Sequence, residues 1–144
     1  MTVLPESAHR LFTEPKNATV ITIDPDGSPQ AALVWAERDG DQVVLGIQHP
    51  HRKTRNLYRD PRLTLVIEDD RVSPRGITQY LTIRGTVELE GPGIPADYKA
   101  LMDRLSQRYL NVPDFPFGEG IWHTGVIARI TINSITGEGP WTNH

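Results

Sequence analysis

The chain has 144 residues, 38% of them hydrophobic and 23% charged, which is ordinary composition for a globular domain with a single hydrophobic core. Its formal net charge of −3 excludes a protein that binds polyanions over its whole surface. There is no cysteine, which excludes disulfides, thiol nucleophiles and cysteine-ligated metal or iron–sulfur centres, so redox chemistry would require a bound cofactor.

The start of the chain, MTVLPESAHRLF, lacks the apolar h-region of a secretory signal. No apolar run approaches the roughly 18 residues that a membrane helix needs. We therefore expect a cytoplasmic protein without a membrane partner, built as a single domain over residues 1–144.

The first third of the chain predicts a short helix followed by extended runs. Pro5 suits a first helical turn, which indicates a helix over residues 5–13. The β-branched and apolar runs ATVITI, QAALVWAE and QVVLGI then alternate with the turn-forming segments DPDGSP and RDGD. Residues 18–47 therefore predict a three-stranded meander.

The middle of the chain predicts a second short helix and two longer strands. Pro50 begins a helix that runs to about Arg59, and Pro61 ends it, because the residue before a proline disfavours helical backbone. The alternating segment RLTLVIED predicts one strand, and ITQYLTIRGTVELE predicts a longer strand with a bulge at Gly85.

The last third predicts a longer helix, an ordered loop and a final strand. Over residues 96–110 apolar side chains recur on one helical face, which we expect to pack on the core: Tyr98, Leu101, Met102, Leu105 and Tyr109. Residues 111–124 are typical of an ordered loop and residues 126–132 of a strand, and Gly137 and Gly139 allow the tail to fold back. About six strands and two or three short helices predict a mainly β protein, an antiparallel barrel and not a doubly wound sheet.

The stretch HPHRKTRNLYRDPR, residues 49–62, concentrates positive charge. It holds five of the 15 Lys and Arg residues of the chain: Arg52, Lys53, Arg55, Arg59 and Arg62. Arg52 and Lys53 fall in the first turn of the predicted helix, where the positive end of the helix dipole disfavours cations. A bound phosphate would offset this cost, because backbone N–H groups and cationic side chains would meet one anion.

The positive charge of this helix does not by itself require a phosphate. The helix face can be solvated and paired with Asp60 or with acids on another strand. A small β-barrel can bind single-stranded nucleic acid through a basic groove with stacking aromatics, but aromatic residues make up only 7% of the chain and the net charge is negative, so we expect no nucleic-acid partner. His49 and His51 have no acidic cluster beside them, so we expect no metal site.

Several motifs of this region follow one another in a specific order. They are Asp26-Gly27-Ser28-Pro29, Val34-Trp35, Asp39-Gly40, and a helix from Arg52-Lys53 through Asn56-Leu57 to Asp60-Pro61-Arg62. In this order and spacing the chain resembles the flavin and deazaflavin oxidoreductases of the pyridoxamine-phosphate-oxidase-like split β-barrel superfamily, over residues 4–135.

The resemblance implies an FMN-binding-like split β-barrel, that is, a Greek-key antiparallel barrel. It also implies a homodimer with the cofactor in a groove at the subunit interface. The cofactor phosphate is expected near Lys53 and Asn56, and the ring system along the strand that bears Val34 and Trp35. The implied cofactor-binding residues are Val34, Trp35, His51, Arg52, Lys53, Arg55 and Asn56.

Within the superfamily, the short chain and the Arg-Lys-x-x-Asn-Leu form are most similar to the branch that uses the deazaflavin coenzyme F420. This implies an F420-dependent reductase that transfers a hydride between the reduced cofactor and a conjugated or heteroaromatic small molecule. F420 and FMN both carry phosphate, so a cluster of cations does not choose between them. An FMN-dependent enzyme and a non-catalytic cofactor-binding or storage protein stay open as alternatives, and the candidate proton donors are Tyr80, Tyr109 and His123.

Overall fold

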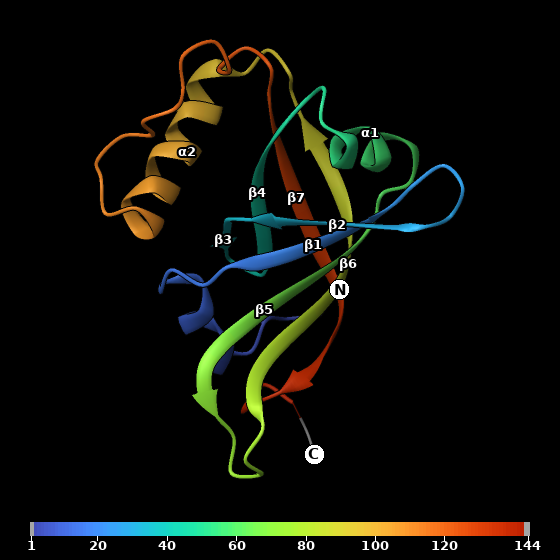
Figure 1. The fold of residues 1–144 in the computed structure, drawn as a ribbon, viewed down its shortest axis with the longest axis vertical. Coiled ribbons are helices and arrows are strands. Elements are labelled where there is room, and N and C mark those ends of the chain that lie inside the picture. Colours follow the sequence, from blue (N-terminus) through green and yellow to red (C-terminus); the bar gives the residue numbers. More distant parts are fainter. Residues whose placement is uncertain (1, 143–144) are drawn as a thin grey trace.

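The computed structural model describes residues 2–142, and its main feature is a curled antiparallel sheet of seven strands (Figure 1). The strands are β1 (Ala18–Ile23), β2 (Pro29–Val34), β3 (Ala36–Asp39), β4 (Gln42–Gln48), β5 (Arg62–Val72), β6 (Thr78–Glu90) and β7 (Gly125–Glu138). Their order in the sheet is β2-β1-β5-β6-β7-β4-β3. A 3₁₀ helix η1 (Glu6–Phe12) and the α-helices α1 (Arg52–Arg59) and α2 (Pro95–Tyr109) complete the fold. The prediction of a mainly β protein with short helices is confirmed.

Both hairpins of the meander predicted over residues 18–47 are present, but its middle run QAALVWAE is not one strand, because it breaks at Trp35. Before the break β2 pairs with β1, with Val34 opposite Ala18. After the break β3 pairs with β4, with Ala36 opposite Leu45. One continuous run of chain therefore forms both edges of the sheet, and this bend at Trp35 brings the two edges together.

The two long strands are confirmed, and so is an irregularity next to Gly85, although the extra residue of the bulge is Asn133 on β7. The register between β6 and β7 shifts at Gly85, since Arg84 lies opposite Ser134 and Gly85 opposite Ile132. A Cβ atom on Gly85 would lie 2.6 Å from the carbonyl oxygen of Thr131, so the close approach of β7 requires a glycine here. The last strand runs well beyond the predicted residues 126–132.

Two hydrophobic clusters stabilise the molecule. The larger fills the curled sheet with alternate residues of the strands, such as Val20, Leu65, Ile83 and Ile130. The smaller packs the apolar face of α2 against β4 and β7, and consists of Val44, Tyr98, Leu101, Met102, Leu105 and Ile127. The predicted core-packing face of the second helix is therefore confirmed for the first four of its residues, Tyr98, Leu101, Met102 and Leu105.

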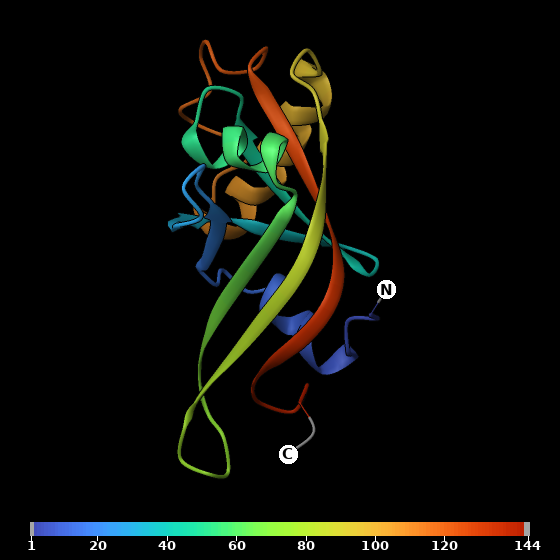
Figure 2. The same ribbon diagram turned by 90° about the vertical axis from the view of Figure 1, so that its right-hand side faces the viewer.

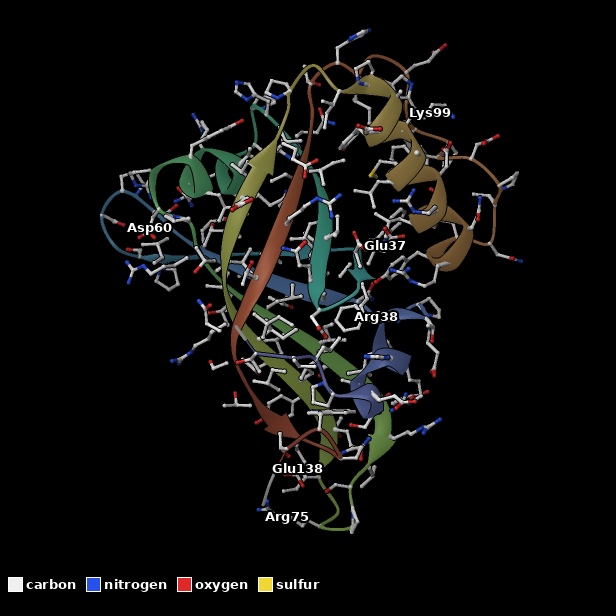
Figure 3. The ribbon with its side chains drawn as sticks, turned by 180° about the vertical axis from the view of Figure 1, so that it is seen from behind. Glu37, Arg38, Asp60, Arg75, Lys99 and Glu138 are labelled. Carbon is white, nitrogen blue, oxygen red and sulfur yellow. The ribbon has the colours of Figure 1, made fainter. Side chains whose placement is uncertain are left out.

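The elements divide between the two ends of the molecule. Helices α1 and α2 lie at one end, and the hairpin of β5 and β6 projects at the other (Figures 1 and 2). At the hairpin end, Arg75 and the buried Glu138 form an ion pair with a nitrogen–oxygen distance of 3.2 Å (Figure 3). The tail folds back as predicted, because the Nε1–H of the buried Trp141 donates to the carbonyl oxygen of Tyr80 at 3.0 Å. Within residues 2–142 no helix combines the length and apolarity that crossing a membrane requires.

Candidate functional site

Helix α1 begins directly after β4, and its inner face ties it to that strand. Pro50 separates the two elements, and the hydroxyl of Thr54 donates to the carbonyl oxygen of Gln48 at 2.6 Å. Thr54, Asn56 and Leu57 are buried on the inner face of the helix. The remaining positions of its first turn therefore point away from the barrel interior.

A buried carboxylate, Asp24, holds α1 against the turn between β1 and β2. It accepts hydrogen bonds from Arg52 Nε and from Asn56 Nδ2, each at 2.9 Å. The Asn56 amide also donates to Thr22 Oγ1 at 3.0 Å, and the Arg59 guanidinium donates to the carbonyl oxygen of Ile23. The Arg52 guanidinium, followed by the Asn56 amide, lowers the pKa of Asp24. Arg52, Asn56 and Arg59 are thus engaged in fixing the helix.

Lys53, like Arg55 and Arg59, has no carboxylate partner within residues 2–142, but it differs from those two exposed arginines because it is partly buried. Its side chain is half-buried, and its Nζ lies 3.4 Å from His51 Nδ1. Burial lowers the pKa of Lys53, and burial together with the charge of Lys53 lowers the pKa of His51. A desolvated ammonium without an anion is a costly arrangement that a bound anion would relieve.

Lys53 and His51 lie at the border of a cleft of about 620 Å³. The cleft is lined by Asn17, Leu33, Val34, Trp35, Gly46, Ile47, Gln48, His51, Lys53, Tyr98, Met102, Leu105, Phe115, Phe117 and Ile121. No Asp or Glu is among these lining residues, so the cleft has a positive border and otherwise mainly apolar walls. This combination suits a planar ligand that carries an anionic group.

The aromatic wall of the cleft is held in place by stacking. The ring of Trp35 lies parallel to that of Tyr109, with centroids 5.1 Å apart and an interplanar angle of 6°. Phe115 meets Trp35 edge to face at 6.2 Å. The Asp103 carboxylate accepts a hydrogen bond from the backbone N–H of Phe115 at 2.9 Å, which anchors the loop after α2. One face of the Trp35 ring therefore packs on Tyr109. Trp35 lies between the two edge strands of the sheet, β2 and β3.

Of the predicted site residues, the structure brings four to the cleft and leaves three outside it. Val34, Trp35, His51 and Lys53 line the cleft. Arg52 and Asn56 face Asp24, and Arg55 is exposed on the outer surface of α1. Among residues 2–142 no group of three or more His, Asp or Glu side chains gathers in a way that could hold a metal ion.

The opposite wall of the cleft comes from α2 and the loop after it, and none of its residues was among the predicted cofactor-binding residues. Tyr98, Met102 and Leu105 border the cleft with the same helical face that packs on β4 and β7. Phe115, Phe117 and Ile121 come from the loop. The three loop residues could have been found from the many apolar side chains in a loop rich in Pro and Gly, because exposed connecting loops are usually polar.

Solved structures share this fold with the chain. An F420 reductase aligns at 24% identity with a TM-score of 0.73, covering 92% of this chain and 98% of that chain. HutZ, the haem storage protein of Vibrio cholerae, aligns at 15% identity with a TM-score of 0.69, covering 96% of each chain. General Stress Protein 26 of Bacillus anthracis aligns at 14% identity with a TM-score of 0.63, covering 92% of this chain and 91% of that chain. At these identities the likeness shows the fold alone.

A family model matches most of the sequence. The model described as pyridoxamine 5′-phosphate oxidase matches residues 4–129. The match extends from η1 into β7 and includes every element that borders the cleft. It confirms the resemblance that the ordered turns, the Val34-Trp35 pair and the basic helix indicated. The chain belongs to the pyridoxamine 5′-phosphate oxidase family.

Proposed function

We propose that this protein is an F420-dependent reductase that binds the deazaflavin in the cleft beside Lys53 and reduces a conjugated or heteroaromatic small molecule. The observation that carries the proposal is a half-buried ammonium that, among residues 2–142, has no carboxylate partner and borders an apolar cleft without acidic lining residues. Membership of the family supports a flavin-type cofactor and oxidoreductase chemistry. The fold shared with an F420 reductase supports the deazaflavin.

The residues of the cleft fit such a cofactor. Lys53 and the first-turn N–H groups of α1 would hold its phosphate, with His51 beside them. Val34 and Trp35 would contact its ring system. When bound, the reduced cofactor supplies the hydride for the substrate. The apolar and aromatic walls exclude water and orient the two flat molecules against each other.

The open side of the cleft supports a dimer. Leu33 and Phe117 line the cleft, yet the two residues are 73% and 72% exposed. Large apolar side chains at the mouth of a binding cleft are typical of a surface that another protein covers. We infer that a second copy of the chain covers this mouth, so that the cofactor lies at a subunit interface.

An FMN-dependent enzyme is the second candidate, because the matching family model is that of pyridoxamine 5′-phosphate oxidase. A storage protein is the third, since the fold is shared with a haem storage protein. The relative affinity for F420 and FMN separates the first two candidates. Catalytic turnover of a substrate separates both enzymes from a storage protein.

The test is a fluorescence titration of the purified protein with F420 and with FMN at identical salt concentration. We expect micromolar or tighter binding of F420 and weaker binding of FMN. The opposite preference would move the protein to the FMN enzymes, and binding of neither would refute a cofactor site at Lys53. A second measurement follows the loss of reduced F420 absorbance when an enone is added, because a storage protein would bind F420 and leave the enone unchanged.

A further inference from the structure

The three proton donors suggested by the sequence lie outside the cleft or are already engaged. The hydroxyl of Tyr109 donates to the carbonyl oxygen of Lys16 at 2.7 Å and accepts from the backbone N–H of Ala36 at 3.2 Å. Tyr80 lies on β6 and His123 in the loop before β7, and neither lines the cleft. A protein group that donates a proton to a ligand in the cleft is therefore to be sought among the other residues that line it.

Tyr98, in the first turns of α2, does line the cleft and is held rigidly. Only 2% of the residue is exposed. Its ring packs on the backbone of Gly125 at the start of β7, where an added Cβ atom would lie 2.2 Å from the ring carbon Cγ. Gly46 on β4 likewise lets α2 approach the sheet closely, because a Cβ atom there would lie 2.6 Å from Met102 Sδ. The two glycines allow the helix to bring the phenol against the sheet.

The hydrogen bonds around Gln48 determine what the Tyr98 hydroxyl can do. Gln48 Oε1 accepts from the hydroxyl of Thr124 at 2.6 Å, and Nε2 donates to the carbonyl oxygen of Ile121 at 3.2 Å. Since a carbonyl oxygen can only accept, the amide must present Nε2–H to Tyr98, whose oxygen lies 2.9 Å away. The phenol oxygen is therefore an acceptor toward Gln48.

The phenol proton is consequently left for a ligand. Within residues 2–142 the Tyr98 hydroxyl makes no hydrogen bond to a protein acceptor. Burial raises the pKa of Tyr98, so the phenol keeps its proton at neutral pH. Gln48 and Tyr98 both line the cleft, so this donor belongs to the wall that a bound molecule would meet.

We propose that Tyr98 is the catalytic proton donor of the cleft, a role that rests on the proposed reductase function and specifies its substrate class as a conjugated carbonyl compound. When bound, a reduced deazaflavin would supply the hydride that bonds to the β carbon of an enone, and the carbon–carbon π pair would shift toward the carbonyl. The carbonyl oxygen takes the proton of the Tyr98 hydroxyl, which gives an enol. Solvent returns a proton to the tyrosinate, and the enol becomes the saturated ketone. The enone is reduced by two electrons and the deazaflavin is oxidised by two.

The test compares Tyr98→Phe with Tyr80→Phe, a matched control whose hydroxyl lies outside the cleft. The Tyr98→Phe side chain keeps the ring over Gly125 and removes only the oxygen. With cyclohex-2-en-1-one and reduced F420, we expect kcat to fall about 100-fold or more in Tyr98→Phe and to stay at the wild-type value in Tyr80→Phe. The Kd for oxidised F420 should stay within about threefold in both variants, and the thermal midpoint of both should match that of the wild type.

A measurement without turnover tests the hydrogen bond itself. The carbonyl stretching band of cyclohex-2-en-1-one bound to the oxidised protein should lie at lower frequency in wild type and in Tyr80→Phe than in Tyr98→Phe, because only the first two proteins donate a hydrogen bond to it. An unchanged kcat in Tyr98→Phe, or a loss of kcat that a weaker Kd for F420 fully explains, would overturn the proposal. If the wild type binds neither F420 nor FMN, the reductase function fails instead. The infrared band then decides separately whether Tyr98 donates to a carbonyl ligand, and equal bands in all three proteins would overturn that too.

Discussion

Replacing Lys53 by methionine tests whether its charge serves a ligand or the fold. Methionine keeps an unbranched side chain of similar length and removes the ammonium. Among the described residues Lys53 has no carboxylate to lose, and its contact with His51 Nδ1 is long, at 3.4 Å. A charge-assisted hydrogen bond to a phosphate contributes about 1.5–3 kcal/mol. We therefore expect Lys53→Met to weaken F420 binding about 10- to 150-fold.

Lys53→Met should weaken F420 binding without lowering the stability of the cofactor-free protein. Burial lowers the pKa of Lys53, so the folded state binds this proton less tightly than the unfolded state does. The unfavourable burial of the charge is complete below the folded pKa and is relieved as pH rises through it toward the unfolded value of about 10.4. Lys53→Met removes this effect. Its free energy of unfolding at pH 7 should equal or exceed that of the wild type.

The assay measures the Kd by fluorescence titration and the free energy of unfolding by urea, for wild type, Lys53→Met and a control. Arg71→Met is the matched control, because Arg71 is an exposed cation at the end of β5, away from the cleft. It should leave both quantities unchanged. Unaltered F420 affinity in Lys53→Met would refute the phosphate site, and a clear loss of stability without a loss of affinity would show that Lys53 serves the fold.

Two further predictions concern the residues that hold the site in place. Asn56→Ala leaves the buried Asp24 and Thr22 without an amide donor at 2.9 and 3.0 Å, so the free energy of unfolding should fall by about 1–3 kcal/mol, and an unchanged urea midpoint would contradict this. The Arg10 guanidinium, bonded to the buried Asp69 at 2.9 Å, is the main cause that holds the pKa of that carboxyl well below its unfolded value of about 3.9. Its stabilisation is complete above the unfolded pKa and is lost as pH falls through the folded pKa. Arg10→Met should therefore reduce stability at pH 7 and flatten the acid side of the stability profile, whereas parallel profiles of the two proteins would count against the pairing.

The element types follow from local chemistry, and for that reason they could be predicted. Pro50 and Pro61 bound α1, and the alternating residues of β5 and β6 need no distant information to be recognised. Gly85 lies next to the bulge, and a side chain there would meet the neighbouring strand. The break at Trp35 has no such local signal, since QAALVWAE is apolar and extended on both sides of it. Only the pairing of β2 with β1 and of β3 with β4 shows that the run changes partners.

The candidate site was predictable as a region and not residue by residue. A cluster of cations in the sequence shows that positive charge is concentrated there. Which of these cations is free to bind a ligand depends on where the nearest carboxylate lies in the fold. Asp24 is 28 residues before Arg52 in the sequence and belongs to a turn segment that predicts only a hairpin. Folding places it under α1, where it neutralises Arg52 and leaves Lys53 without a carboxylate among the described residues. The α2 wall of the cleft, including Tyr98, could not be predicted from the sequence, because the same helical face packs on the core and lines the cleft.

The pairing of Arg52 with Asp24 also bears on the choice between the two cofactors, which the sequence left open. Among the described lining residues, Lys53 then supplies the one permanent positive charge, and the lowered pKa of His51 favours its neutral form near pH 7. FMN carries a phosphate monoester with a charge of about −1.5 to −2 at pH 7, because its second pKa is about 6. The phosphate of F420 is a diester with a single charge. A site with one half-buried cation balances a monoanion and would leave a dianion partly uncompensated in an apolar cleft, where uncompensated charge is expensive. Within one copy of the chain, this charge balance supports the proposal of a deazaflavin cofactor, and the reason becomes visible only once Arg52 is known to pair with Asp24.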